Sequence, residues 1–210
     1  MTKLAGYDDE MVDAATKLEG SGTRDVARRA VRAEIAATAM ELFLAEGYEE
    51  TTVKQIGAAV GMAGRTLFRY FDTKEDLVIG GLIELGADVA AALARRPADE
   101  DPWNALRHAL QVCVESMERD ELGLRRATML ANTPSLRTAM LDKQLRWQQM
   151  LVPHIENRLH GPEQLRALQS RALVSAALTC LDVGATVWTE VEGSQPLTHL
   201  VDAAFAAVRT

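Results

Sequence analysis

The sequence predicts an all-α protein, divided into a small N-terminal three-helix unit and a larger C-terminal helical domain. Three observations support this fold class. Alanine and leucine, which favour helices, are abundant. Apolar residues recur at steps of three and four, and no stretch keeps the apolar–polar alternation of a strand. We place a flexible N-terminal arm at 1–23, the three-helix unit at 24–76 and the helical domain at 77–210.

The first helix of the three-helix unit is predicted over residues 24–46. Its apolar residues fall on one face and can pack against the other helices of the unit; they are Val31, Ile35, Ala39, Leu42 and Phe43. Gly47 follows at the position where glycine commonly ends a helix. The preceding 23 residues are polar, acidic and interrupted by glycine, which predicts the loosely ordered arm.

Two short helices follow this first helix. Thr51 or Thr52 caps a helix that runs to Val60. Gly61 interrupts it, and a third helix is predicted over 64–70. Two short helices joined by a glycine turn are typical of a helix-turn-helix, whose second helix enters the major groove of DNA.

The predicted recognition helix offers side chains suited to DNA. Starting at Gly64, it exposes Arg65, Thr66, Phe68, Arg69 and Tyr70, and the guanidinium fork of arginine matches two acceptors of guanine. Thr52, Lys54 and Lys74 lie at helix starts, where amides and cations meet phosphates. Spacing alone leaves an alternative open, in which the unit is structural and its arginines are solvated charges.

Longer helices follow, the first of them capped by Asp72 and Thr73. We place them at 73–95, 102–119, 122–132, 134–159, 162–191 and 196–209. Four of the segments begin with proline at or near the first turn, a favoured position.

The N-terminal half closely resembles the DNA-binding domain of the TetR family of bacterial transcriptional regulators. The resemblance covers roughly residues 24–80. It rests on Glu46-Gly47-Tyr48, Thr51-Thr52-Val53, Ile56, Val60-Gly61, Thr66 to Phe71 and Lys74 to Leu77, together with the segment Ala39 to Phe43. It implies a homodimer of about nine helices per subunit, a palindromic operator in double-stranded DNA, and a C-terminal domain that binds a small-molecule effector and relieves repression.

The resemblance also implies residue roles. Thr52 and Lys74 match phosphate contacts, and Thr66 and Tyr70 match contacts of the recognition helix. Arg65 and Arg69 lie where base or phosphate contacts vary among members. Two departures matter: Ala63 stands where a capping serine or threonine is frequent, and Phe68 stands where a tyrosine is frequent.

The last two helices carry the predicted dimer interface. Small residues on the penultimate helix permit close helix packing, and the last helix offers an apolar stripe. The tentative interface comprises Ala172, Ala176, Cys180, Gly184, Leu197, Val201, Ala204, Phe205 and Val208. The alternative is that these residues form the internal core of a single subunit.

The tentative effector pocket lies among the helices of the C-terminal domain. Tryptophans and methionines suit adaptable apolar cavities, and a polar line on the penultimate helix suits ligand contact. The candidates are Trp103, Leu106, Leu110, Met117, Met140, Trp147, Leu151, His154, Thr179 and Asp182. Each can instead be a core or solvent-facing residue. A buried, unpaired Asp182 would demand a cationic or hydrogen-bonding partner.

Net charge and hydropathy exclude some classes of protein. The net charge of −7 argues against indiscriminate coating of nucleic acid, but not against a basic face that reads sequence. No apolar run approaches the roughly 20 residues of a membrane span, and the first residues lack a signal-peptide core. We therefore expect a cytoplasmic protein that makes no contact with a membrane.

We expect the cysteines and histidines to have structural roles rather than catalytic or metal-binding ones. Cys113 and Cys180 are far apart and lack metal-ligand spacing, so we expect buried free thiols, no metal and no cofactor. A helical enzyme using His108, His154, Cys113 or Asp182 finds no supporting motif. A further alternative is a ligand sensor of the same fold that has lost specific DNA binding.

Overall fold

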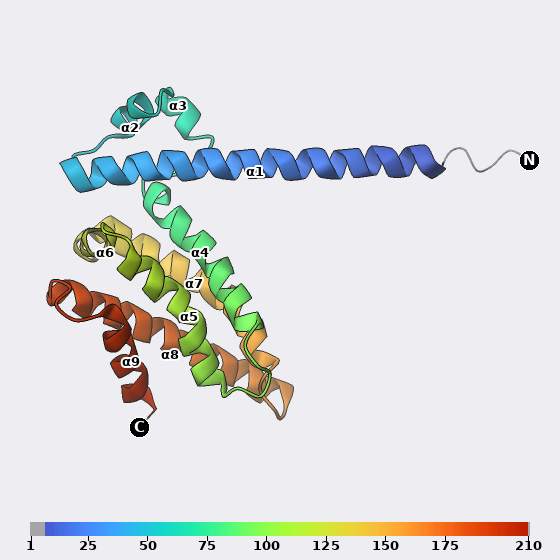
Figure 1. The fold of residues 1–210 in the computed structure, drawn as a ribbon, viewed down its shortest axis with the longest axis vertical. Helices are drawn as coiled ribbons and strands as arrows, with labels where there is room; N and C mark the ends of the chain where they lie inside the picture. Colours follow the sequence, from blue (N-terminus) through green and yellow to red (C-terminus); the bar gives the residue numbers. More distant parts are fainter. Residues whose placement is uncertain (1–6, 210) are drawn as a thin grey trace, which may run out of the picture.

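A computed structural model describes the backbone of residues 7–209 and the side chains of residues 26–209. Within that range the chain forms helices and no strands, which confirms the all-α prediction. The helices are α1 (Tyr7–Glu46), α2 (Val53–Ala59), α3 (Gly64–Leu67), α4 (Asp76–Ala94), α5 (Pro102–Arg119), α6 (Gly123–Asn132), α7 (Pro134–Glu156), α8 (Glu163–Glu190) and α9 (Leu197–Val208) (Figure 1).

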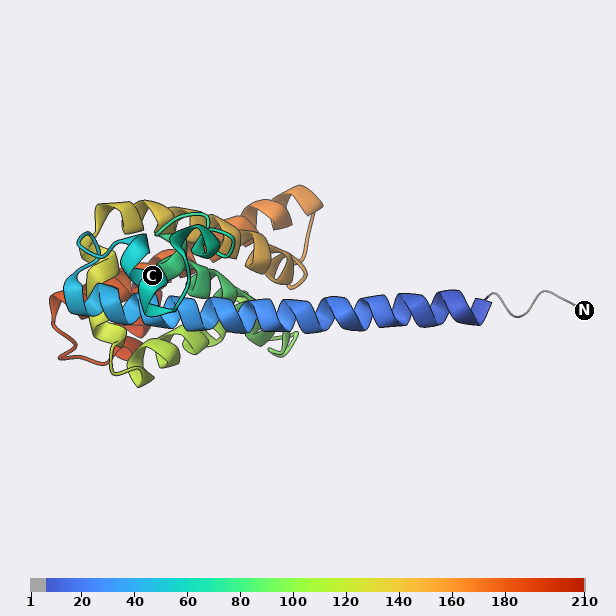
Figure 2. The same ribbon diagram turned by 90° about the horizontal axis from the view of Figure 1, so that it is seen from above.

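Helix α1 is much longer than predicted. It begins at Tyr7 rather than near Arg24, and its N-terminal part projects beyond the rest of the molecule as a single rod (Figures 1 and 2). A loosely ordered arm was expected over 1–23, and the structure has helix over 7–23. The segment contains no proline, and Gly20 and Gly22 each cost a helix only about 1 kcal/mol.

The N-terminal unit packs α2, α3 and the start of α4 against the C-terminal half of α1. Its buried core includes Ile35 and Phe43 of α1, Ile56 of α2 and Leu67 of α3. The turn between α2 and α3 needs glycine at position 57, because an added Cβ would lie 2.7 Å from the Met62 carbonyl oxygen. This close approach fixes α3 against α2.

Helices α4 to α9 form the C-terminal domain around one apolar core. In this domain α4 packs on α5 and α7, and α8 packs on α5, α6, α7 and α9. The N-terminal end of α7 belongs to the other half of the molecule: Leu136 is fully buried in the core of the N-terminal unit. The two halves are therefore joined by packed side chains as well as by the chain.

Two helices are long and apolar enough to cross a membrane, judged by length and composition alone. They are α4 and α8. Neither contains an unbroken apolar run of about 20 residues, because Glu84 and Asp88 interrupt α4 and Arg171 and Asp182 interrupt α8. Both helices pack against several others in the C-terminal domain. The core helices of a folded domain can be as long and as apolar as a membrane span.

Candidate nucleic-acid interface and effector site

Helix α2 begins with a reciprocal cap. The Gln55 amide donates to Thr52 Oγ1 at 3.2 Å, and the Thr52 amide donates to Gln55 Oε1 at 2.8 Å. Thr51 is buried and donates to the Gly47 carbonyl instead at 2.7 Å. Of the two predicted caps, Thr52 is therefore the one used. Its side chain and that of Lys54 are exposed.

Helix α3 is shorter than predicted. It ends at Leu67, so Arg69 and Tyr70 lie in the following turn. The hydrogen bonds explain this: the Arg69 amide donates to the Thr66 carbonyl at 3.1 Å and the Tyr70 amide to the Leu67 carbonyl at 2.9 Å, which is the tighter three-residue pattern. Ala63 supplies no side-chain cap, as its departure from the family pattern implied.

The exposed side chains of α3 and its turn gather on one face. Leu67 is buried, whereas Arg65, Phe68 and Arg69 are exposed, at the three- and four-residue spacing that makes helix neighbours. Phe68 is 51% exposed. Thr66 and Tyr70 are half-buried. This face offers two guanidinium groups and an apolar ring.

Two arginines of α1 support this turn, and sequence analysis did not single them out. Arg28 donates to the Arg69 carbonyl at 3.4 Å, and Arg32 donates to the Tyr70 carbonyl. The Arg32 guanidinium also lies 4.4 Å from the centre of the Phe71 ring. The sequence signal was present, since Arg28 and Arg32 are four residues apart on the polar side of α1.

Lys74 is turned toward the protein. Its ammonium donates to the Tyr48 carbonyl and lies 4.2 Å from the centre of the Tyr48 ring and 5.6 Å from that of Phe43. The side chain is half-buried. This position differs from the outward phosphate contact that the resemblance implied, because the aromatic pair beneath α4 attracts the cation.

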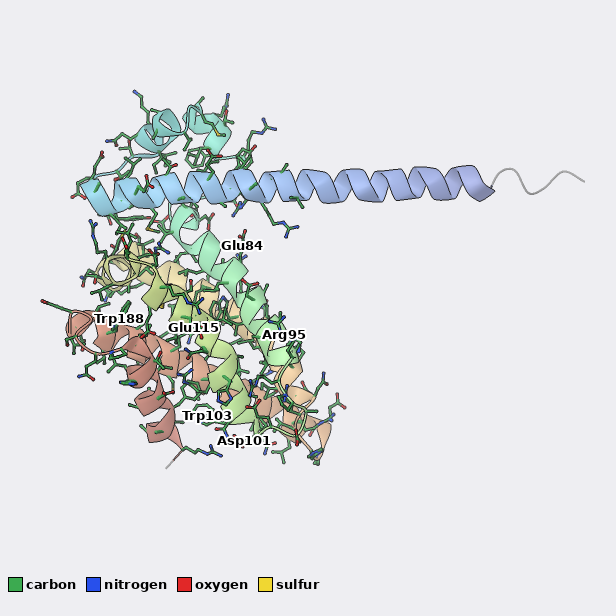
Figure 3. All side chains as sticks on the ribbon, viewed as in Figure 1. Glu84, Arg95, Asp101, Trp103, Glu115 and Trp188 are labelled. Atoms are coloured by element: carbon green, nitrogen blue, oxygen red, sulfur yellow. The ribbon has the colours of Figure 1, made fainter. Side chains whose placement is uncertain are left out.

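The predicted pocket residues lie in several different surroundings. Leu106, Leu110 and Leu151 are fully buried in the core of the C-terminal domain. Trp103 packs on α9, with its indole nitrogen donating to the Phe205 carbonyl at 3.3 Å (Figure 3). Each of these apolar side chains fills a space within the core.

Four other pocket candidates occupy different surroundings. Met140 packs against the core of the N-terminal unit, because α7 begins there. Thr179 is exposed on α8, while Met117 and His154 are half-buried. The assignment of these four residues to the effector pocket stays a prediction.

Trp147 joins α4 to α7. Its indole nitrogen donates to the Leu82 carbonyl at 3.0 Å. A Cβ on Gly86 would lie 2.5 Å from that nitrogen, so the glycine gives the indole its place against α4.

Lys143 is the functional candidate that sequence analysis missed. It is 5% exposed, and its ammonium lies 3.8 Å from Asp182 Oδ1 and 4.6 Å from the centre of the Trp147 ring. Burial raises the pKa of Asp182 and the Lys143 charge opposes that rise. Asp182 is therefore paired. Lys143 precedes Trp147 by four residues, and this spacing could have placed it on the buried face.

Most of the predicted dimer residues are buried within one subunit. Gly184 faces Val201, and an added Cβ would lie 2.7 Å from its side chain. Cys180 donates to the Ala204 carbonyl at 3.5 Å. Leu197 and Phe205 are also buried. The small-residue stripe of α8 receives α9 of the same chain, so the alternative of an internal core applies to these residues.

The other interface candidates differ in exposure. Ala172 and Val208 are exposed, whereas Ala176 and Ala204 are half-buried. Ala172 and Val208 are therefore accessible to a second subunit, whereas Ala176 and Ala204 pack against the core of their own subunit.

The groups weighed for catalysis have ordinary partners. His108 Nδ1 lies 2.7 Å from Glu100 Oε1, and Arg96 bonds the same carboxylate. Burial raises the pKa of the Cys113 thiol to about 12, so it is a poor nucleophile. Among the described residues no three metal-ligating side chains gather.

Two open hollows lie outside the predicted pocket. One lies beside α4 and α5 and includes Leu85, Val112 and Glu115; Figure 3 labels Glu115 on α5. The other is lined by Arg28, Arg29, Arg32 and Glu84, where α1 crosses α4. Neither contains a residue assigned to the effector pocket from the sequence.

Comparison with known families matches both halves of the chain. The model for bacterial regulatory proteins of the tetR family matches residues 35–79, and the model for the MftR C-terminal domain matches residues 100–210. Together these matches take in α2, α3 and all helices from α5 onward.

Two curated relatives match parts of the sequence. The transcriptional regulator TcmR of Streptomyces glaucescens is 39% identical over 103 residues, which are 49% of this chain and 46% of TcmR. The mycofactocin biosynthesis regulator MftR of Mycobacterium tuberculosis is 28% identical over 128 residues, or 60% of this chain and 65% of MftR. The matches thus span about half and just under two thirds of these relatives.

Solved structures share the fold at low sequence identity. FadR of Thermus thermophilus, in complex with lauroyl-CoA, has a TM-score of 0.53 and 23% identity, covering 83% of this chain and 91% of that one. FadR of Bacillus subtilis, in complex with stearoyl-CoA, has a TM-score of 0.54 and 15% identity, covering 82% and 94%. FadR of Bacillus halodurans has a TM-score of 0.57 and 17% identity, covering 83% and 92%.

Proposed function

Because this chain belongs to the TetR family of bacterial regulatory proteins, we propose that it represses transcription as a homodimer on a palindromic operator. Residues 24–76 bind double-stranded DNA, and residues 77–210 dimerise and bind a small-molecule effector that releases the operator. The observation that carries the proposal is the exposed face of α3 and its turn, where Arg65, Phe68 and Arg69 are all exposed.

Direct contact with DNA is assigned to exposed groups of the helix-turn-helix. Arg65 suits a guanine edge in the major groove, and Thr52 and Lys54 at the start of α2 suit phosphates. Gly64, Thr66, Phe68, Arg69 and Tyr70 complete the surface. Lys74 contributes less than the others, since its ammonium already has partners on Tyr48.

Effector release is a shift between two populations. An effector that prefers the conformation unable to fit the operator weakens DNA binding by its differential affinity, typically about 1–3 kcal/mol. Helix α4 connects the two halves and packs on α1, α5 and α7, so its movement changes the separation of the recognition helices. Half-sites are spaced by about 34–36 Å or multiples of it, which makes that separation decisive.

The family also bears on location and chemistry. A regulator that acts on chromosomal DNA works in the cytoplasm, and we assign it no catalytic activity. The exposed His108, which pairs with Glu100, and the protonated Cys113 thiol support this assignment, since neither forms a nucleophile–base pair.

Selection of bound genomic fragments by the purified protein tests the proposal. We expect a palindrome to be enriched, and Arg65→Ala to lose discrimination between it and a scrambled duplex. Lys54→Ala is the matched control. It should weaken binding to both duplexes alike, and the slope of log affinity against log salt concentration should decrease by about one, as expected for one lost phosphate contact. Enrichment of no sequence, or unchanged discrimination in Arg65→Ala, contradicts the proposal.

A further inference from the structure

Lys143 carries a positive charge into the middle of the C-terminal domain, and no step of DNA recognition uses it. Only 7% of its side chain is exposed. Burying an ammonium is costly unless close partners replace its water. Its one carboxylate neighbour, Asp182 Oδ1, lies at 3.8 Å, which is longer than the roughly 2.7–3.2 Å of a hydrogen bond. The ammonium is therefore held by a loose ion pair and by the Trp147 ring, so a better-placed anion can compete with Asp182.

Four helices meet around this charge. Lys143 and Trp147 come from α7, Asp182 from α8, Gly86 from α4 and Cys113 from α5. The indole ring of Trp147 lies 4.6 Å from the ammonium and rests against Gly86, and the charges of Lys143 and Asp182 both act on the Cys113 thiol. A group bound at this place would lie beside α5 and α7, the two helices of the C-terminal domain on which α4 packs.

From this geometry we propose that Lys143 binds the acidic group of a small organic anion, and that the Asp182 carboxylate pairs with Lys143 when no ligand is bound. This inference rests on the proposed function and specifies the effector class of the same domain. The ligand is an organic acid ionised at neutral pH, with an uncharged apolar remainder suited to the aromatic and aliphatic surroundings.

The two partners differ in exposure, and this decides the sign of the ligand charge. The Asp182 side chain is 39% exposed and that of Lys143 is 7% exposed. Asp182 can turn to water with little penalty, whereas Lys143 cannot. An incoming anion therefore replaces the Asp182 carboxylate from the solvent side, while a cation would have to pair with Asp182 and leave Lys143 alone in the core. Asp88 of α4 is exposed, so its charge is screened by solvent.

A matched pair of fluorescent probes tests the proposal with the full-length protein. 1-Anilinonaphthalene-8-sulfonate and N-phenyl-1-naphthylamine have the same ring system, but only the first is an anion. We expect Lys143→Met to weaken binding of the sulfonate about tenfold or more and to leave binding of the neutral amine within about twofold.

Asp182→Asn provides an opposite test on the same pair. It removes the competing carboxylate, so the affinity for the sulfonate should rise several-fold while that for the neutral amine stays unchanged. Lys143→Arg, which keeps the charge, should retain most of the sulfonate binding. Thermal melting by circular dichroism establishes that each variant is folded before it is compared.

Three results overturn the inference: no binding of the sulfonate to the wild-type protein, equal losses of both probes in Lys143→Met, or weaker sulfonate binding in Asp182→Asn. Operator binding by the same preparations separates this failure from that of the proposed function. A protein that binds its operator but ignores the charge of the probe refutes only the anion site. A protein that selects no DNA sequence refutes the regulator.

Discussion

Several charged side chains in this protein take their direction from partners that are far away in the sequence. Arg28 and Arg32 look like solvated charges on α1, yet both donate to carbonyls of the turn after α3. Lys74 looks like an outward cation at a helix start, yet it lies over the Tyr48 ring. At this scale, the direction of a charged side chain is set by the aromatic ring or carbonyl that it can reach.

The contact of Arg32 predicts a role in DNA binding without contact to DNA. Arg32→Met removes the bond to the Tyr70 carbonyl and the cation–π contact with Phe71, so the turn after α3 loses support. We expect a loss of about 1–2 kcal/mol in the free energy of unfolding and weaker operator binding. Urea denaturation and a gel-shift titration measure the two effects. Lys54→Met, a change at an exposed lysine, should leave the unfolding midpoint unchanged; equal midpoints for both variants refute the role of Arg32.

The ion pair at Glu100 predicts a dependence of stability on pH. Hydrogen bonding from Arg96 lowers the pKa of Glu100 to about 2, against a smaller opposing effect of burial. A carboxylate with a lowered pKa stabilises the fold at pH values above its ordinary pKa, and this contribution disappears as the pH falls toward 2. We expect the urea midpoint to fall less between pH 5 and pH 3 in Glu100→Gln than in the wild-type protein. Parallel pH profiles would show that Glu100 contributes nothing.

At the scale of helices, two helix pairs pack closely because a glycine on one helix leaves room for a side chain of the other. Gly184 brings α8 against Val201 of α9, and Gly86 brings α4 against Trp147 of α7. Both contacts lie within one subunit. The outer sides of α8 and α9, where Ala172 and Val208 are exposed, are the parts left for a second subunit.

A pair of glycine substitutions separates packing from helix propensity. Gly184→Ala places a methyl group 2.7 Å from the Val201 side chain and 3.2 Å from its backbone nitrogen, so we expect destabilisation of about 1–3 kcal/mol. Gly81→Ala meets nothing within 4 Å in the interior of α4 and should stabilise by about 0.5–1 kcal/mol. Calorimetric melting measures both. A Gly184→Ala variant as stable as Gly81→Ala would show that α9 does not pack as described.

Helix-level prediction from the sequence succeeded where local signals decide. Helix positions from α5 to α9 follow proline starts and apolar spacing, and they agree with the structure within a few residues. Periodicity identifies a buried face but not the element that covers it, so Gly184 and Val201 were assigned to a dimer. The start of α1 was missed because Gly20 and Gly22 looked like breaks. Lys143 was missed because burial of a cation depends on Asp182, which is distant in the sequence.

At the scale of the whole molecule, the DNA-facing half and the C-terminal half share contacts beyond α4. Leu136 of α7 is buried in the N-terminal core. Arg125 of α6 donates to the Leu44 carbonyl near the end of α1 at 2.6 Å. Both α6 and α7 are thus in direct contact with the unit that contains the recognition turn.

The hydrogen bond from Arg125 of α6 to the Leu44 carbonyl of α1 leads to a prediction about coupling. Its removal should weaken the coupling between effector binding and operator binding, but not operator binding itself. Arg125→Ala should leave operator affinity without effector within about twofold, yet reduce the effect of a bound effector on that affinity by roughly 1 kcal/mol. Arg119→Ala is the control, because Arg119 pairs only with Glu115 of its own helix among the described contacts. Fluorescence anisotropy with and without the effector gives both quantities; equal coupling in the two variants rules out this route.

The projecting part of α1 affects how the protein moves in solution. With 40 residues at about 1.5 Å each, the helix is about 60 Å long, whereas a compact chain of this size has a radius of gyration of only about 17 Å. Such a rod increases friction far more than mass. Elution volume from a sizing column therefore overstates molecular weight, and light scattering or sedimentation equilibrium is the appropriate way to count subunits.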